Sequence, residues 1–296
     1  MCSFEKCWLN YACNEMSSKY AGIFKSIYSD FDGTVTGNTI AEIKEGFGIF
    51  FGKEPVLLEK QANMCDGIWL KQYEKSDNKA ADEFEPGTEG YSIYYDGENQ
   101  LIVVAASGEN GVMYGVFELL RIIQSGRDIC DINICHAPKM PIRMIDHWDN
   151  IMGDIERGYS GDSFFFKENE ILFGDRTKAY ARMMASIGIN AITINNVNVH
   201  EVESYLITDR FLGMMKKYSD LFVSYGIKLY LSVNFASPMQ IGGLGVCDPL
   251  DDGVIKWWNE TSRHVYEVIP EFGGYLVKAD SEGRPGPFTY GRTHAD

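Results

Sequence analysis

The chain has 296 residues, a formal net charge of −15 and a pI near 4.8, and 45% of its residues are hydrophobic. That apolar content suffices for a buried core and excludes an intrinsically disordered chain. The negative charge excludes nucleic acid or an anionic membrane as the main partner, because both would repel the chain. The negative charge does not exclude a small anionic ligand, since a few local cations can override the electrostatic field of the net charge.

The seven cysteines follow no zinc spacing, and their number is odd. The pattern closest to a metal site is Cys130 and Cys135 followed by His136, and buried thiols are the favoured interpretation there. The N-terminal stretch lacks a basic segment followed by an apolar run, so no signal peptide is expected. No apolar run approaches the roughly 18 residues of a membrane span. If Met1 is the true start, we expect a reduced, cytoplasmic protein.

Residues 1–137 are predicted to form a small N-terminal α/β sandwich domain. Its expected elements are, in chain order, a strand at 23–28, a turn at 30–33, a helix at 41–51, a hairpin with strands 91–95 and 101–106, and a helix at 112–124. The turn Asp96-Gly97-Glu98-Asn99 predicts the hairpin. Asn110 is the expected cap of the last helix, and Gly126 is expected to end it. No chemical motif stands out in this region.

A regular alternation of strands and helices begins after Pro138-Lys139-Met140-Pro141, so a second domain is expected at 138–296. Its expected elements are strands at 143–148, 190–197, 228–235 and 274–280, and helices at 177–187, 210–225 and 254–268. The strands start at intervals of roughly 40 to 50 residues, which fits the βα units of a parallel sheet.

Two architectures fit this alternation, a doubly wound sheet and a (β/α)8 barrel. Polar or aromatic residues follow each strand: His147-Trp148-Asp149-Asn150, Asn195-Asn196-Val197-Asn198, Asn234-Phe235 and Lys278-Ala279-Asp280. In a barrel these strand ends meet at one mouth, where barrel enzymes carry their chemistry. A doubly wound sheet commonly has a Gly-rich phosphate loop after its first strand, and this chain has none. We therefore expect the first four βα units of an incomplete TIM (β/α)8 barrel.

The last stretch, Gly273–Asp296, is predicted to form the rim of an active site. Lys278, Asp280 and Glu282 occupy alternate positions and project to one side if the strand persists that far. A loop dense in Gly and Pro follows, and it contains Arg284, Tyr290, Arg292 and His294.

Four long segments of the second domain resemble the α-glucuronidases of glycoside hydrolase family 67. They read MPIRMIDHWDNIMGDIERGYSGDSFFF, YARMMASIGINAITINNVNV, YGIKLYLSVNFASP and GYLVKADSEGRPGPFTYGRTHAD. The hairpin and helix at 90–124 and the early Cys-Trp-Leu-Asn-Tyr are similar to that family's N-terminal domain. The resemblance covers essentially the whole chain. It implies an N-terminal domain followed by half of a catalytic barrel, with the rest of the barrel and a helical C-terminal region missing.

The resemblance implies a hydrolase of xylan degradation. Family members cleave the α-1,2 bond between (4-O-methyl-)glucuronic acid and the terminal xylose of xylo-oligosaccharides, with inversion. Inversion needs a general acid and a general base roughly 6.5–9.5 Å apart. In the Lys-Ala-Asp-Ser-Glu motif the acid corresponds to Glu282, and the family's bases have no counterpart here. No metal or organic cofactor is implied, and a homodimer of the full-length protein stays open.

The resemblance also implies residues that bind the glucuronate. Lys278 would pair with the sugar carboxylate, and Trp148 would stack on the sugar ring. From the residues alone, Lys278 could instead form a structural salt bridge and Trp148 could pack in the core. Glu156 and Arg157 either contact substrate or brace each other.

Further polar residues keep two interpretations each. Asn196, with Asn195 and Asn198, either binds sugar hydroxyls or ties loops together. Asp280 either raises the pKa of Glu282 by like-charge repulsion or pairs with Lys278 or Arg284. Arg292 and His294 line the mouth or only shape it, whereas His147 and His200 are expected to be structural.

Two other functions compete with this one. The first is a catalytically inactive carbohydrate-binding remnant of such an enzyme, which keeps Lys278 and Trp148 but has no base. The second is a retaining or substrate-assisted glycosidase such as a β-hexosaminidase, against which the long motifs argue. Some family members are secreted, so an extracellular location is the alternative to the cytoplasm.

Overall fold

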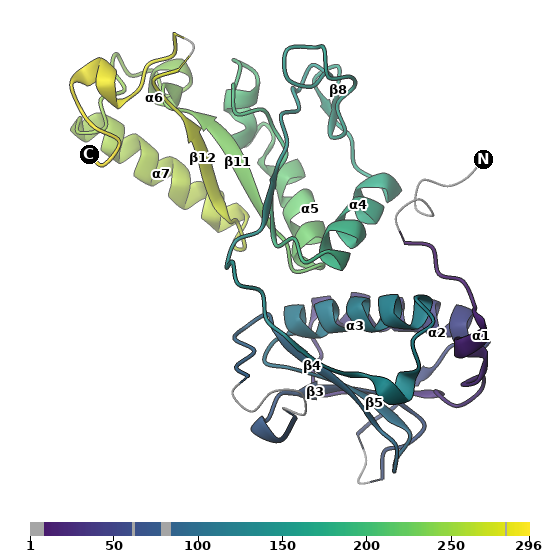
Figure 1. Ribbon diagram of the computed structural model, residues 1–296. Helices are drawn as coiled ribbons and strands as arrows, with labels where there is room; N and C mark the ends of the chain where they lie inside the picture. The colour runs from purple at the N-terminus through teal and green to yellow at the C-terminus, as the bar shows by residue number, and fades with distance from the viewer. Residues whose placement is uncertain (1–8, 61–62, 78–83, 282) are drawn as a thin grey trace. The chain divides into compact units, whose positions relative to one another are not determined.

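The computed structural model describes residues 9–60, 63–77, 84–281 and 283–296, which form two compact units (Figure 1). The first unit runs to Pro141 and includes 179–188 and 224–226, and the second unit holds the remainder. The expected class, α/β with parallel sheets, is confirmed. The domain limits 1–137 and 138–296 stay predictions.

The first unit is built on a mixed sheet. In sheet order its strands are β2 (Val56–Leu57), β1 (Ser26–Ser29), β3 (Gly67–Gln72), β5 (Leu101–Ala106), β4 (Tyr91–Asp96) and β6 (Asn133–His136). Strands β2, β1, β3 and β5 are parallel, whereas β4 runs antiparallel to both of its neighbours. Every residue of β5 is buried, which explains its continuous apolar sequence in the middle of the sheet.

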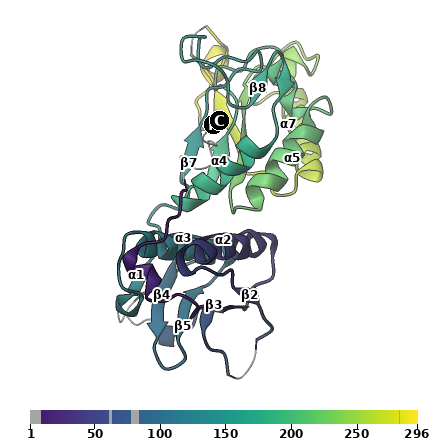
Figure 2. The ribbon, with the colours of Figure 1, turned by 90° about the vertical axis from the view of Figure 1, so that its right-hand side faces the viewer.

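Helices α2 (Thr34–Phe51) and α3 (Glu109–Gln124) both cover one face of this sheet (Figures 1 and 2). Their apolar sides and that sheet face form the main core, which includes Phe24, Phe47 and Leu120. On the opposite face, a smaller cluster around Tyr28 and Val103 is packed by aromatic side chains. The short elements of the unit are α1 (Glu15–Ser18), η2 (Lys75–Asp77) and η3 (Ile129–Asp131).

The structure corrects the start of the helix after the predicted hairpin. The hairpin strands lie at 91–96 and 101–106, the first one residue longer than expected and the second as expected, but α3 already begins at Glu109. Gly108 is the N-cap, so the prediction that Asn110 caps this helix is wrong; Asn110 lies inside its first turn. Gly126, with φ of 78°, directly follows the C-cap, so the predicted end is confirmed.

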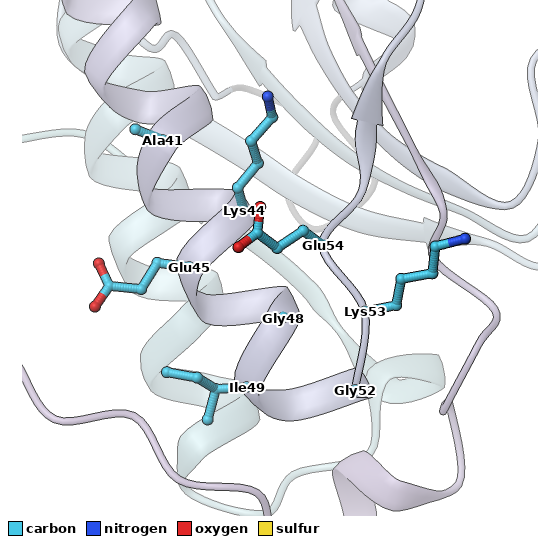
Figure 3. Close-up of a pocket in the computed structure, with 8 residues that line it drawn as sticks. All are labelled: Ala41, Lys44, Glu45, Gly48, Ile49, Gly52, Lys53 and Glu54. Carbon is cyan, nitrogen blue, oxygen red and sulfur yellow. The ribbon is translucent and has the colours of Figure 1, made fainter.

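The C-terminal half of α2 borders a hollow of about 560 Å³ (Figure 3). Lys44 and Glu45 of the helix and Lys53 and Glu54 of the residues that follow belong to its lining. Its lining therefore carries equal numbers of positive and negative side chains.

The second unit contains a parallel sheet in the order β12-β11-β10-β7. The strands are β7 (Met144–Asp146), β10 (Ala191–Thr193), β11 (Lys228–Asn234) and β12 (Gly274–Lys278). The helical elements are α4 (Asp175–Ser186), η4 (Glu203–Ile207), α5 (Leu212–Val223), α6 (Ser237–Gln240), α7 (Asp252–Val268) and η5 (Pro287–Tyr290). Helix α5 packs against β11 and α7. A small hairpin, β8 (Phe166–Lys167) with β9 (Glu170–Ile171), follows the loop after β7.

The cysteines also differ from the sequence interpretation. Cys130 is exposed and Cys135 is half-buried, so the prediction of buried thiols at this pair is wrong. Within the described ranges, no group of three or more His, Cys, Asp or Glu residues is placed to hold a metal ion. No helix in the described part of the chain is both long enough and apolar enough to span a membrane.

Candidate functional site

A buried carboxylate organises the loop that follows β7. Asp149 is 1% exposed and accepts hydrogen bonds from Ser163 Oγ at 2.6 Å and from the Phe164 backbone N–H at 2.5 Å. His147 Nδ1 lies 3.3 Å from the other carboxylate oxygen. Burial alone would raise the pKa of Asp149, but the contacts with His147, Ser163 and Phe164 outweigh it and hold that pKa below its usual range. The ionised Asp149 therefore holds both ends of the loop.

Asparagine side chains connect this loop to the end of β10. Asn196 Nδ2 donates to Asn150 Oδ1 at 2.9 Å and to the Glu156 carbonyl at 3.2 Å. Asn196 Oδ1 accepts from the Asn198 backbone N–H at 2.8 Å. Because Asn196 is 1% exposed, its amide ties two loops together in this structure. Its predicted contact with substrate stays a prediction.

These loops enclose a cavity of about 620 Å³ at the carboxyl ends of the strands. Its lining consists mostly of polar and charged residues from the loops after β7, β10 and β12: Asn150, Met152, Asp154, Glu156, Arg157, Asn198, His200 and Arg284. The predicted pair Glu156 and Arg157 belongs to it. His200, expected to be structural, is exposed and lines the cavity.

Glu156 has an unusual backbone and an unsatisfied carboxylate. Its φ is 60°, a region that non-glycine residues seldom occupy. Its Oε1 lies 3.6 Å from Arg157 Nε, but its buried Oε2 has no hydrogen-bond partner among the described residues. The predicted mutual brace with Arg157 is present, and it leaves one buried carboxylate oxygen without a partner among the described residues.

Lys278 ends β12 beside the same cavity. Its ammonium donates to Asn198 Oδ1, and Asn198 lines the cavity wall. Arg284 donates to the backbone carbonyls of Val199 and Asn198. The amide oxygens of the β10 loop therefore place two cations, Lys278 and Arg284, at one side of the cavity.

Trp148 is held at its indole nitrogen. Trp148 Nε1 donates to Asp146 Oδ2 at 3.1 Å, and Asp146 Oδ1 accepts from the Thr193 hydroxyl. The indole is 38% exposed, so it is not packed in a core. Trp148 does not belong to the cavity wall, although its backbone carbonyl accepts from the Glu156 N–H at 2.9 Å.

Asp280 does not continue the alternating pattern predicted for the end of β12. The strand ends at Lys278, and Asp280 has φ of 53°. Its Oδ2 accepts from the Phe288 backbone N–H at 3.1 Å and lies 3.7 Å from His294 Nε2. The expectation that Lys278 and Asp280 project from one strand face is therefore wrong, because the backbone turns between them. Asp280 closes the loop 280–288 on itself.

Arg292 and Tyr290 anchor the chain after this loop. Arg292 donates from Nε and Nη2 to the two carboxylate oxygens of Asp248, at 3.2 and 3.1 Å. The Tyr290 hydroxyl accepts from the Cys247 backbone N–H at 3.1 Å. Arg292 is thus fixed by a bidentate ion pair and is absent from the cavity wall. Glu282, the predicted general acid, lies outside the described residues.

The site can bind a small ligand that combines negative charge with hydroxyl groups. Arg157, Arg284 and the adjacent Lys278 supply cations, and Asp154 and Glu156 supply carboxylate acceptors. Sequence reasoning singled out neither Asp154 nor Met152. Asp154 lies in a loop where charged residues are common, so nothing in its spacing distinguishes it.

Fold and site together define a class of protein: an α/β protein with a cavity, lined mostly by polar residues, at the carboxyl ends of parallel strands. The model of the glycosyl hydrolase family 67 middle domain matches residues 122–296, and that of the glycosyl hydrolase family 67 N-terminus matches 7–119. The chain belongs to glycosyl hydrolase family 67, which confirms the resemblance seen in its motifs.

Curated relatives agree with this membership. Alpha-glucuronidase A of Emericella nidulans is 36% identical over 98% of this chain and 35% of its own length. Probable alpha-glucuronidase A of Aspergillus terreus is 35% identical over the same shares. The chain therefore spans about a third of the length of these relatives.

Solved structures share the fold at low sequence identity. A family GH115 4-O-methyl-α-glucuronidase matches 90% of this chain and 37% of its own with a TM-score of 0.57 and 13% identity. A GH20 exo-β-N-acetylglucosaminidase from Vibrio harveyi matches 90% of this chain and 44% of its own, with a TM-score of 0.52 and 10% identity. At these identities the likeness concerns the fold alone.

Proposed function

We propose that this chain is part of an α-glucuronidase that hydrolyses the α-1,2 bond between (4-O-methyl-)glucuronic acid and the terminal xylose of xylo-oligosaccharides. The observation that carries the proposal is the cavity wall, which contains the cations Arg157 and Arg284 together with carboxylate and amide acceptors, and whose Asn198 accepts a hydrogen bond from Lys278. An anionic sugar needs local cations in a protein whose net charge is −15. Family membership and the names of the relatives support the same reaction.

Four residues take roles in this proposal. Glu282 is the general acid that protonates the leaving xylose oxygen, with inversion at the sugar. Lys278 pairs with the substrate carboxylate, and Trp148 offers its exposed ring as a platform. The unpaired oxygen of Glu156 accepts from a sugar hydroxyl.

The proposal includes the fold of the whole enzyme. The parallel order β7-β10-β11-β12 supports the first half of a (β/α)8 barrel. In the family the general base belongs to later strands than those matched here. We therefore infer that these 296 residues alone release no glucuronic acid.

The test is Glu282→Gln in the protein expressed from its complete reading frame. The variant is expected to lose about 10²–10⁴-fold in the release of glucuronic acid from aldouronic acids, because no group then protonates the leaving oxygen. An aryl glucuronide with a good leaving group needs little protonation, so its hydrolysis should fall much less. Equal losses on both substrates would argue for a structural role of Glu282.

The matched control is Glu260→Gln on α7, where the exposed carboxylate pairs with Lys256 at 3.8 Å. This variant should keep full activity. Turnover by Glu282→Gln at the rate of the unaltered protein would contradict the assignment. Binding of aldouronic acids without any turnover by the complete protein would favour the inactive, carbohydrate-binding alternative.

A further inference from the structure

A cavity of about 500 Å³ in the first unit has no part in the site described above. It lies where β1 and β2 end and α2 begins, and its lining includes Phe31, Asp32, Thr36 and Gly37 from the segment that joins β1 to α2 and from the start of α2, and Leu57, Leu58, Glu59 and Lys60 from the end of β2 and the residues after it. In the sheet order, β2 lies on one side of β1 and β3 on the other. The cavity thus opens outside the carboxyl ends of the parallel strands β1 and β2, on the side of β1 away from β3.

A buried hydroxyl in the cavity wall lacks a partner. Thr36 is 1% exposed, and its Oγ1 makes no hydrogen bond within the part of the chain that the structure describes. About one turn further along α2, Thr39 Oγ1 donates to the Val35 carbonyl at 2.9 Å. This is the usual way in which a threonine hydroxyl inside a helix finds a hydrogen-bond partner. Buried polar groups are normally paired, so the Thr36 hydroxyl points to a ligand group.

The charges around this cavity disfavour an anion. The positive N-terminal end of α2 already has a carboxylate, because Glu109 Oε2 accepts from the Thr36 backbone N–H at 3.0 Å. Lys60 Nζ is paired with Asp30 Oδ1 at 2.8 Å. Asp32 and Glu59 add further negative charge to the wall. Phosphate and glucuronate would both be repelled.

The remaining wall suits an uncharged sugar. Leu57 and Leu58 are 47% and 40% exposed, and with Phe31 they offer the apolar surface on which the C–H face of a pyranose packs. The carboxylates of Asp32 and Glu59 can accept hydrogen bonds from sugar hydroxyls. The Thr36 hydroxyl can donate to a sugar oxygen.

We propose that this cavity binds an uncharged pyranose unit of a polysaccharide. If the proposed function holds, that unit is a xylose of the xylan backbone, and this identification of the polysaccharide rests on the proposed function. Binding there would hold a long substrate on the protein independently of the site that accepts its glucuronate.

The test is calorimetric titration of the purified chain with xylotetraose, with glucuronic acid and inorganic phosphate as the anionic probes. Gly37→Trp is the blocking variant: Gly37 lines the cavity, and a Cβ there meets no atom within 4 Å, so a side chain can begin at this position without displacing backbone. Gly37→Ala is its control. We expect xylotetraose binding that Gly37→Trp abolishes and Gly37→Ala retains.

Thr36→Val provides a second variant that does not fill the cavity. It keeps the side-chain volume and removes the unpaired hydroxyl, so its melting temperature should equal or exceed that of the unaltered protein. Its affinity for xylotetraose should fall about fivefold, the value of one neutral hydrogen bond. Thr36→Ser, which keeps the hydroxyl, should bind nearly as well as threonine.

Three results would overturn the proposal: no binding of xylotetraose, binding that Gly37→Trp leaves intact, or binding of glucuronic acid or phosphate that Gly37→Trp removes. Release of glucuronic acid from aldouronic acids is a separate measurement. Its failure would contradict the proposed function, while xylotetraose binding sensitive to Gly37→Trp would still support a sugar site.

Discussion

Asp149 determines the conformation of the loop that forms one wall of the candidate site. Its ionised carboxylate accepts from Ser163 and from the Phe164 N–H, and His147 lies beside it. We expect Asp149→Asn to lower the free energy of unfolding at pH 7 by about 1–3 kcal/mol, since an amide replaces one acceptor with a donor. Urea denaturation measures this, and Asp162→Asn, an exposed residue of the same loop, is the control.

The same variant should alter the pH dependence of stability. Because folding lowers the pKa of Asp149, the carboxylate stabilises the fold above its unfolded pKa of about 3.9, and this contribution is lost as the pH falls through the folded pKa. The stability difference between the unaltered protein and Asp149→Asn should therefore be largest near neutrality and shrink below about pH 4. A difference that stays constant from pH 7 to pH 3 would contradict an ionised Asp149.

Asn196 and Asn198 show what local sequence leaves undetermined at this scale. Both follow β10 and both are amides, so their spacing in the sequence cannot distinguish a residue that binds substrate from one that connects loops. In the structure Asn196 donates hydrogen bonds to Asn150 and to the Glu156 carbonyl, whereas Asn198 lines the cavity and accepts a hydrogen bond from Lys278. Only the path of the β7 loop distinguishes them, and that path depends on tertiary contacts.

At the scale of elements, the segment from β12 to η5 depends on a close backbone approach. A Cβ on Gly286 would lie 2.3 Å from Asp280 Cγ and 2.4 Å from Asp280 N. We expect Gly286→Ala to force residues 280 and 286 of this loop apart, break the bond from the Phe288 N–H to Asp280, and lower the free energy of unfolding by about 1–3 kcal/mol. Faster hydrogen exchange at the Phe288 amide would report the break.

Gly245→Ala is the matched control for that variant. A Cβ on Gly245 meets no atom within 4 Å, so its exchange pattern should equal that of the unaltered protein. Unchanged protection of the Phe288 amide in Gly286→Ala would show that the loop accommodates a side chain, and the predicted dependence of the loop on the close approach at Gly286 would then be wrong.

Helices and strands are predictable from the sequence where the hydrophobic pattern agrees with the Gly, Pro and Asn residues that mark turns and helix ends. The hairpin of β4 and β5, helix α7 and the parallel strands β11 and β12 follow directly from such patterns. Strand β3 does not, because its sequence contains Lys71, which is nearly buried and paired with Asp77 at 2.7 Å. A buried lysine becomes acceptable only through that tertiary ion pair. The predicted ends of β10 and β12 lie beyond the observed ones for a different reason: the polar residues after each strand continue its local pattern.

At the scale of the whole molecule, the parallel sheet of the second unit ends in strands β7 and β12. Parallel sheets are normally covered on both faces, and an open edge strand offers unpaired backbone groups to another chain. Val277 on β12 is 51% exposed, which adds an apolar side chain to that edge. We therefore expect the 296-residue chain to self-associate in a concentration-dependent way.

A charged substitution on β12 tests whether this edge strand mediates the self-association. Val277→Lys places a cation on β12, which opposes pairing between two copies of the strand, so the monomer fraction in sedimentation velocity should rise severalfold at equal concentration. Ile255→Lys on α7, where the native side chain is 42% exposed, adds the same charge away from the edge and should leave association unchanged. If both variants dissociate the protein equally, net charge governs association, and the role assigned to the β12 edge would be wrong. A monomeric unaltered chain at all concentrations would also exclude it, and would imply that the sheet tolerates both open edges.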